Sequence, residues 1–141
     1  MIDTRIWVPL SYMLTIITLS SVPGSPSPEQ NIHLEWLPSI LQNALHVPLY
    51  ALLTLLWLWA TQNYAGSSRV RIASIACFCI GFAIVDELYQ TTIPGRHGSV
   101  SDVGLDTLGI CVCCWLLHRF PNSIPFLSTF PKSPEPATIQ R

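Results

Sequence analysis

The hydrophobic pattern of this chain divides into four apolar runs separated by polar connections. The runs cover residues 6–22, 44–60, 72–85 and 103–117. None of them shows a polar face at helical spacing, and a helix that is apolar all round is either buried or faces lipid. A spanning helix needs about 20 mostly apolar residues, in a range of roughly 17–25, so the last two runs reach that range only with their polar ends. The pattern predicts an all-α bundle of four helices.

Composition places this predicted bundle in a membrane. Only 11% of the 141 residues are charged and 50% are hydrophobic, whereas soluble domains carry about 25% charged residues. A soluble protein with so few charges would present an apolar surface to water. The formal net charge of -1 leaves no basic footprint for nucleic acid. We therefore expect a multi-pass transmembrane protein whose main partner is the lipid bilayer.

Basic residues predict the orientation of the four helices, because Lys and Arg collect on the cytoplasmic side of membrane proteins. The first connection, residues 23–43, contains neither, the second carries Arg69 and Arg71, and the third carries Arg96. Other basic residues precede the first run or follow the last: Arg5, Arg119, Lys132 and Arg141. We expect both termini to be cytoplasmic, with the first and third connections outside.

The predicted domain organisation has two parts. Residues 1–120 form the four-helix membrane domain, and the Pro- and Ser-rich residues 121–141 form a disordered tail. The first run is less typical of a cleaved signal peptide, since the sequence that follows it, "SSVPGS", lacks a small-x-small cleavage pattern. We expect the first run to stay in the membrane as a helix.

Ionisable residues concentrate in one stretch, residues 86–109, which follows the third apolar run and extends into the start of the fourth. The third helix is expected to end near residues 89–90, and Pro94-Gly95 is a typical turn pair. The fourth helix is expected to begin near residues 99–101, where Ser99 and Asp102 have the spacing of an acidic capping box. This arrangement places the polar stretch at the outer end of the bundle.

The topology brings polar side chains to one depth at this outer end, and we predict a ligand-binding pocket formed by His46, Glu87, Gln90, Arg96, Asp102 and Asp106. Ionisable groups inside spanning segments cost roughly 2.5–3.5 kcal/mol at the helix centre, so they face the bundle interior and pair. Arg96 is the expected counter-ion of Glu87 or Asp102. One Arg cannot neutralise these three carboxylates and that of the neighbouring Asp86, so a protonated carboxylate, a bound cation or a cationic ligand group must settle the imbalance.

An ordinary interfacial role competes with the pocket. For Asp86 and His97 we favour that role, with Asp86 as a solvated helix end, because charges at the interface are common. His46 fits either role, since a lone His at a helix start is often only interfacial. The remaining residues taken together favour a functional pocket: Glu87, Gln90, Arg96 and Asp102.

At these residues the chain resembles the VanZ-like family of small bacterial membrane proteins. The matching pattern is a His-x-x-x-Tyr helix start, a Glu-x-x-Gln, an Arg after a short turn, and an Asp in a Gly-containing helix. It is carried here by His46 and Tyr50, Glu87 and Gln90, Arg96, Asp102, and Asp106 to Gly109. The resemblance covers about residues 44–117. The chain departs from the family at Asp106, where Asn is usual, and at Cys113, which replaces a second Gly.

The resemblance implies a multi-pass protein of the bacterial cytoplasmic membrane. The family's founding member is associated with reduced sensitivity to glycopeptide antibiotics, notably teicoplanin, which act on cell-wall precursors outside the membrane. It therefore implies a cell-envelope role, which we interpret as binding or protecting a lipid-linked or amphiphilic molecule. Two alternatives stay open: an enzyme using Glu87 or Asp102 as general acid or base with His46 as partner, and a subunit whose polar cluster only holds helices together.

The five cysteines lie inside apolar runs and do not indicate a disulfide framework. Residues 73, 77 and 81 step by four, as do Gly109 and Cys113, and small residues at this spacing let membrane helices approach closely. We favour this packing role over a thiolate metal site, because no His or carboxylate joins the cysteines. No phosphate loop, nucleophile elbow or zinc-protease motif occurs, so the predicted site includes no cofactor and no metal.

Overall fold

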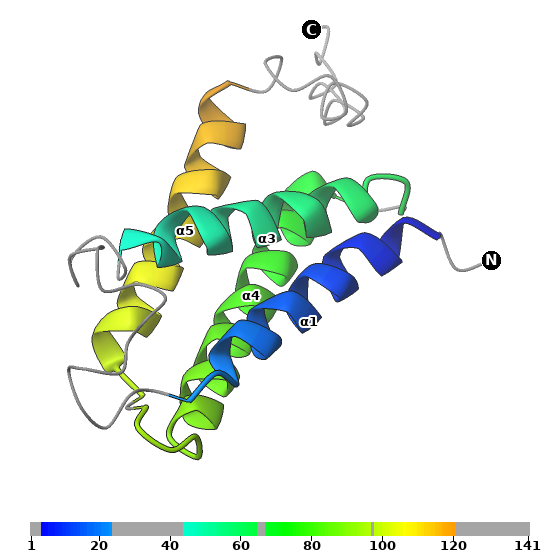
Figure 1. The fold of residues 1–141 in the computed structure, drawn as a ribbon. Coiled ribbons are helices and arrows are strands. Elements are labelled where there is room, and N and C mark those ends of the chain that lie inside the picture. Colours follow the sequence, from blue (N-terminus) through cyan, green and yellow to red (C-terminus); the bar gives the residue numbers. More distant parts are fainter. Residues whose placement is uncertain (1–3, 24–43, 65–66, 97, 121–141) are drawn as a thin grey trace, which may run out of the picture.

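The structure is a computed structural model that describes residues 4–23, 44–64, 67–96 and 98–120. These residues are all-helical, as predicted, with a short 3-10 helix at Thr4–Ile6 and four α-helices. The α-helices are α1 (Trp7–Ser20), α3 (His46–Ala60), α4 (Ser68–Gln90) and α5 (Val100–Arg119) (Figure 1). The predicted first connection, the predicted tail and His97 lie outside the described residues.

The four helices pack into one bundle in which α3 has the most extensive contacts. It lies across α5 and also packs against α1 and α4 (Figure 1). α4 and α5 pack against each other along the hairpin that the turn after Gln90 creates. The C-terminal ends of α1 and α4 meet the N-terminal end of α5, as the predicted alternation of helix direction requires.

Each helix buries one narrow stripe and exposes apolar side chains elsewhere. The core combines residues from all four helices, including Ile16, Leu53, Leu58, Cys79 and Ile110. Several large apolar side chains on the outside are 60% exposed or more: Trp7, Leu14, Val70, Leu88 and Trp115. An apolar exterior of this kind suits a helix that faces lipid as well as protein.

Two of the helices are long and apolar enough to cross a membrane, namely α4 with 23 residues and α5 with 20. The apolar helix α3 is shorter, at 15 residues, and α1 has 14. The two longer helices extend beyond the apolar runs of the sequence because their polar ends are helical too. The charged stretch of the sequence is therefore partly inside the helical hairpin.

The packing stripe of α4 differs from the predicted one. Ala73, Cys77 and Gly81 are exposed, and a Cβ added to Gly81 would meet nothing within 4 Å. The buried stripe lies two residues further along and consists of Ile75, Cys79 and Ala83. The prediction was wrong because this helix is apolar on every side, so its buried face follows from the polar residues at its end, which are buried on the same side.

On α5 the predicted small-residue contact is confirmed, since Gly109 and Cys113 are both buried. A Cβ added to Gly109 would overlap the carbonyl oxygen of Val47 and lie 3.1 Å from its Cα. Only glycine allows this approach of α5 to the start of α3. The contact also places Asp106, about one turn before Gly109, beside His46, the residue before Val47.

Replacing Gly109 with Ala should therefore loosen the contact between α3 and α5. Forcing a methyl group into a packed contact costs about 1–3 kcal/mol, so we expect Gly109→Ala to lower the thermal unfolding midpoint of the detergent-purified protein. Gly104→Ala is the matched control, because it lies on the same helix and its added Cβ would meet nothing within 4 Å. Equal midpoints for the two variants would contradict the close approach.

Candidate functional site

Three polar side chains at the C-terminal end of α4 point into the bundle. Asp86, Glu87 and Gln90 are 2%, 5% and 6% exposed, and their spacing places them on one helical face. The burial of Asp86 corrects the prediction that it is a solvated helix end. The end of α1 covers it, because Ser20 Oγ donates to Asp86 Oδ2 at 2.9 Å.

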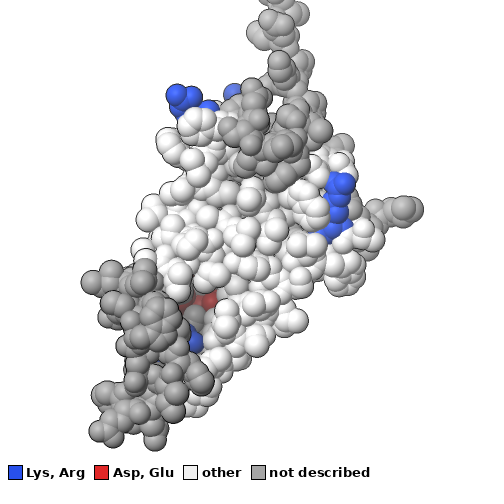
Figure 2. Space-filling model, turned by 45° about the horizontal axis from the view of Figure 1, so that its top comes forward, with Lys and Arg blue, Asp and Glu red and all other residues white. Residues whose placement is uncertain are grey.

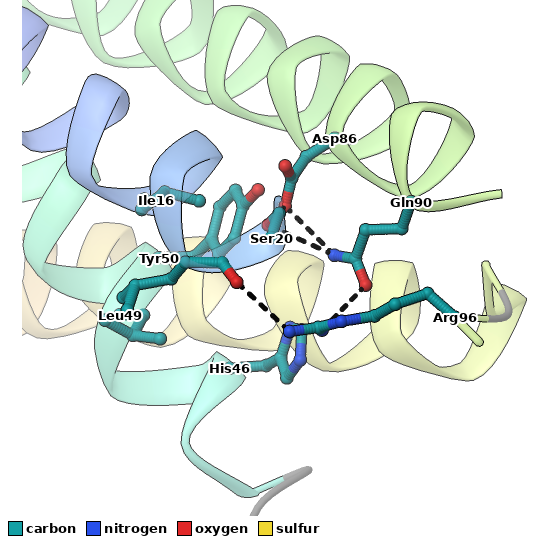
Figure 3. Close-up of a pocket in the computed structure, with 9 residues that line it drawn as sticks. Ile16, Ser20, His46, Leu49, Tyr50, Asp86, Gln90 and Arg96 are labelled. Carbon is teal, nitrogen blue, oxygen red and sulfur yellow. Dashed lines mark hydrogen bonds between the residues drawn. The ribbon is translucent and has the colours of Figure 1, made fainter. Parts of the chain in front are cut away.

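Gln90 joins the buried acids to the rest of the site (Figure 3). Its Nε2 lies 3.3 Å from Ser20 Oγ, from Asp86 Oδ2 and from Glu87 Oε1. An amide NH₂ has two hydrogens to donate, so these acceptors share them. The carbonyl oxygen of the same amide accepts from Arg96 Nη1 at 3.2 Å. One neutral side chain therefore separates the carboxylates from the guanidinium.

Arg96 is held at the end of α1, and its partners differ from the prediction. Its Nε donates to the Val22 carbonyl at 3.0 Å and its Nη2 to the Leu19 carbonyl at 3.1 Å. Among the described residues Arg96 forms no ion pair with a carboxylate, so the counter-ion prediction was wrong. The carbonyls at a helix C-terminus lack helical partners and attract cations. Arg96 therefore binds these carbonyls of α1 and not the carboxylates.

The turn before Arg96 directs the guanidinium to α1. The Arg96 N–H donates to the Ile93 carbonyl at 3.1 Å, and Pro94 and Gly95 occupy the two central positions of the turn. Gly95 has a φ of 73°, which a type II turn requires at its third residue and which Gly adopts without strain. The predicted Pro-Gly turn is confirmed.

Glu87 fixes the start of α5. Its Oε2 accepts from the backbone N–H of Ser99 at 2.8 Å, which satisfies a donor that a helix start leaves unpaired. The predicted capping box is not formed, because the Ser99 side chain bonds Ser101 and makes no cap hydrogen bond. Gly98 permits this contact, since a Cβ there would lie 2.6 Å from the Glu87 carbonyl oxygen.

His46, which is partly buried, and the buried Asp106 form a pair between α3 and α5. His46 Nδ1 lies 2.8 Å from Asp106 Oδ1, and the Asp106 side chain is 1% exposed. Asp106 Oδ2 is buried without a hydrogen-bond partner. Glu87 lies near this pair, and the three residues each offer a ligand atom within 4.8 Å of the other two. The Asp106 carboxylate, which stands where the family usually has Asn, therefore pairs directly with His46.

A cavity of about 110 Å³ lies between α1, α3 and the end of α4. Leu19 contributes to its apolar wall, together with Ile16 and Leu49, which Figure 3 shows across from the polar Gln90 and Arg96. The polar lining residues are Ser20, His46, Tyr50, Asp86, Gln90 and Arg96. Figure 2 shows the same contrast from outside, with acidic atoms in a recess beside basic atoms on a largely uncharged face.

The structure brings five of the six predicted site residues together by contact. His46, Gln90 and Arg96 line the cavity, while Glu87 and Asp106 lie in the network behind it. Asp102 is in the first turn of α5, as predicted, and its buried Oδ1 has no partner in the part of the chain that the structure describes.

Sequence reasoning missed the contribution of α1. Ser20 contacts both Asp86 and Gln90, and the carbonyls of Leu19 and Val22 hold Arg96. The position of Ser20 near the outer end of the first run is compatible with a place in the site, but hydroxyl residues near helix ends are too common for this position to predict one.

The fold and the site define an all-helical protein with two membrane-length helices and a buried acidic cluster at one end. The family model for VanZ/LLP1 matches residues 4–121, so the chain belongs to the VanZ/LLP1 family. This match includes α1, which the resemblance from the sequence did not cover. No curated protein and no solved structure matches the chain significantly.

The network predicts that Gln90 is important for stability. Gln90→Leu would leave the carboxylates of Asp86 and Glu87 with fewer donors, and each buried unsatisfied group costs about 1–3 kcal/mol. We expect a lower thermal unfolding midpoint in detergent than for the wild type. Thr92→Val is the control, because its hydroxyl is exposed and bonds only the nearby Tyr89 carbonyl. A Gln90→Leu protein as stable as the control would contradict the network.

Proposed function

We propose that this protein is a multi-pass protein of the bacterial cytoplasmic membrane that binds an anionic amphiphile, such as a lipid-linked phosphate of the cell envelope, at its outer end. The observation that carries the proposal is the position of Arg96. Neutral acceptors hold it at the cavity wall, and three of the five N–H donors of its guanidinium bond described residues. Within the described residues, the other two donors are available to a ligand.

The size and lining of the cavity support binding of a headgroup and not of a whole lipid. Water occupies about 30 Å³ in the liquid, so the cavity of about 110 Å³ is suited to a group of a few heavy atoms, such as a phosphate. Ile16, Leu19 and Leu49 provide an apolar wall beside the polar side chains. The acyl or prenyl chain would then run along the apolar outside of the bundle.

The distribution of charge supports an orientation with this site outside. The basic residues of the opposite end lie at the C-terminal end of α3: Arg71 Nη1 donates to the carbonyl of Gln62, just after α3, at 3.2 Å, and the Arg5 guanidinium lies 5.5 Å from the centre of the Trp59 ring. The buried acids are at the other end. Positive residues favour the cytoplasmic side, so the acidic end would face outward, where envelope precursors and glycopeptide antibiotics act.

The His46–Asp106 pair favours a second candidate function, an enzyme acting on the same kind of molecule. A carboxylate bonded to Nδ1 orients an imidazole and leaves Nε2 for acid–base chemistry. Nε2 has no partner among the described residues, and His46 lines the cavity. Glu87 or Asp102 would be the second acid–base group. The binding function ranks first because no described nucleophile is hydrogen-bonded to His46.

The proposed orientation predicts a labelling pattern in intact cells. In a cysteine-free background, Thr92→Cys should react with a membrane-impermeant thiol reagent, while Ser67→Cys should react only after the cells are opened. Both side chains are exposed and lie at opposite ends of α4. The reverse pattern would place the acidic end in the cytoplasm and remove the physical basis for an outer-leaflet ligand.

The proposed ligand predicts a specific role for Arg96. Charged hydrogen bonds contribute about 1.5–3 kcal/mol, so Arg96→Gln should weaken binding of a polyprenyl phosphate to the protein in lipid nanodiscs by about 10–100-fold. Arg69→Gln, an exposed Arg at the other end of α4, is the control.

Three other outcomes would change this interpretation. Equal binding of the uncharged polyprenol would contradict phosphate recognition. Release of phosphate from the probe by the wild type, lost in His46→Gln, would select the enzyme. Equal loss of protein level in Glu87→Gln, Arg96→Gln and Asp102→Asn would favour a purely structural cluster.

A further inference from the structure

We propose that His46, Glu87 and Asp106 form a binding site for one divalent first-row metal ion. The three residues come from three different helices, α3, α4 and α5, and each offers a ligand atom within 4.8 Å of the other two. Ligands at about 2.0–2.2 Å from an ion lie up to about 4.4 Å apart, so small side-chain movements complete the geometry.

The His46–Asp106 contact already has the spacing of two ligands of one ion. Nδ1 and Oδ1 are 2.8 Å apart, close to the roughly 3 Å between neighbouring ligands of an octahedral ion with bonds of about 2.1 Å. A metal would replace the shared proton, because it binds neutral imidazole and ionised carboxylate. Glu87 would be the third ligand, and positions for water or another ligand would stay open, as in catalytic metal sites.

An unpaired buried oxygen provides a second, independent observation. Asp106 Oδ2 has no hydrogen-bond partner among the described residues, although the Asp106 side chain is 1% exposed. A buried oxygen without a partner is costly even when the other oxygen of the same carboxylate is bonded, as here to His46. A cation bound to the Asp106 carboxylate would remove this cost.

The charge balance of the site favours a cation from outside the chain. Asp86, Glu87 and Asp106 are buried, while Arg96 bonds one amide and two backbone carbonyls. Protonated His46 can offset one of these three carboxylates. A divalent ion among His46, Glu87 and Asp106 would offset two while His46 stays neutral.

Neighbouring groups already orient the ligands. The Ser99 N–H fixes one oxygen of Glu87, and the Gln90 amide contacts the other at 3.3 Å. The close approach at Gly109 fixes the distance between α3 and α5. Such outer contacts orient metal ligands and change metal affinity about 10–100-fold. The site is therefore supported by residues that do not themselves bind the ion.

The ligand set selects the kind of ion. One imidazole with two carboxylates suits Mn²⁺, Fe²⁺ or Zn²⁺ better than Mg²⁺ or Ca²⁺, which prefer oxygen ligands alone. Mn²⁺ is the better probe here, because the described helices carry five free cysteines and thiolates bind Zn²⁺ readily. An open position on the ion would also attract a phosphate in the adjacent cavity. That link rests on the proposed function, whereas metal binding does not.

The test is a titration of the chelator-stripped, detergent-purified full chain with Mn²⁺, followed by electron paramagnetic resonance. We expect one bound Mn²⁺ per chain. His46→Gln, Glu87→Gln and Asp106→Asn should each weaken Mn²⁺ binding by about 100-fold. Loss of an outer contact alone weakens metal binding by about 10–100-fold, so the loss of a direct ligand should reach at least the upper end of that range. Asp86→Asn is the matched control, since it removes an equally buried carboxylate next to Glu87 that is outside the cluster. His118→Gln controls for an exposed histidine.

Each outcome decides the proposal. Absence of stoichiometric Mn²⁺ from the wild type at millimolar concentration would overturn it, as would binding that survives in the three ligand variants or that Asp86→Asn abolishes equally. Should the ligand variants fail to fold, the wild type still carries the test, because a bound ion must raise its unfolding temperature. Arg96→Gln should bind Mn²⁺ normally, so failure of the anionic ligand and failure of the metal site are distinguishable.

Discussion

Three buried carboxylates, those of Asp86, Glu87 and Asp106, lie at one end of a bundle whose outside is largely apolar. Burial removes such groups from the hydrogen bonds of water, so the protein itself must supply their partners. Ser20 of α1 bonds Asp86, the Ser99 N–H at the start of α5 bonds Glu87, and His46 of α3 bonds Asp106. Every helix of the described bundle therefore contacts an acid, and the acids fix how the ends of the helices meet.

The same requirement determines the packing further along the helices. α4 is apolar on every side, so its hydrophobic residues alone leave its rotation open. Turning Asp86, Glu87 and Gln90 inward also turns Cys79 and Ala83 inward and leaves Cys77 and Gly81 exposed. On α5, burial of Asp106 accompanies burial of Gly109, whose missing side chain allows α3 to approach. Polar residues thus determine which face of each helix is buried, and small residues such as Gly109 determine how closely two helices approach.

This dependence explains what could be predicted from the sequence. The four described helices, the end of α4 at Gln90 and the start of α3 at His46 follow from apolar length and from turn residues such as Pro94 and Gly95. The partners of Arg96 could not be predicted, because they are backbone carbonyls at the end of another helix. The charges in the sequence favour a carboxylate as the partner of Arg96, whereas the turn before Arg96 directs its side chain to α1. The sequence predicted a solvated Asp86 because Ser20, the residue that buries it, lies 66 positions earlier in the chain.

The separation of Arg96 from the acids links the two proposals. An Arg bonded to Glu87 or Asp102 would be neutralised and would leave the cavity without a free cation. Gln90 instead stands between them, accepting from Arg96 and donating to the acids. The acids then repel an anionic ligand unless something offsets their charge. A metal ion between His46, Glu87 and Asp106 would weaken that repulsion and place a second cation at the cavity, since His46 belongs both to the metal site and to the cavity lining. An anion would bind between two cations, and its affinity would depend on the metal.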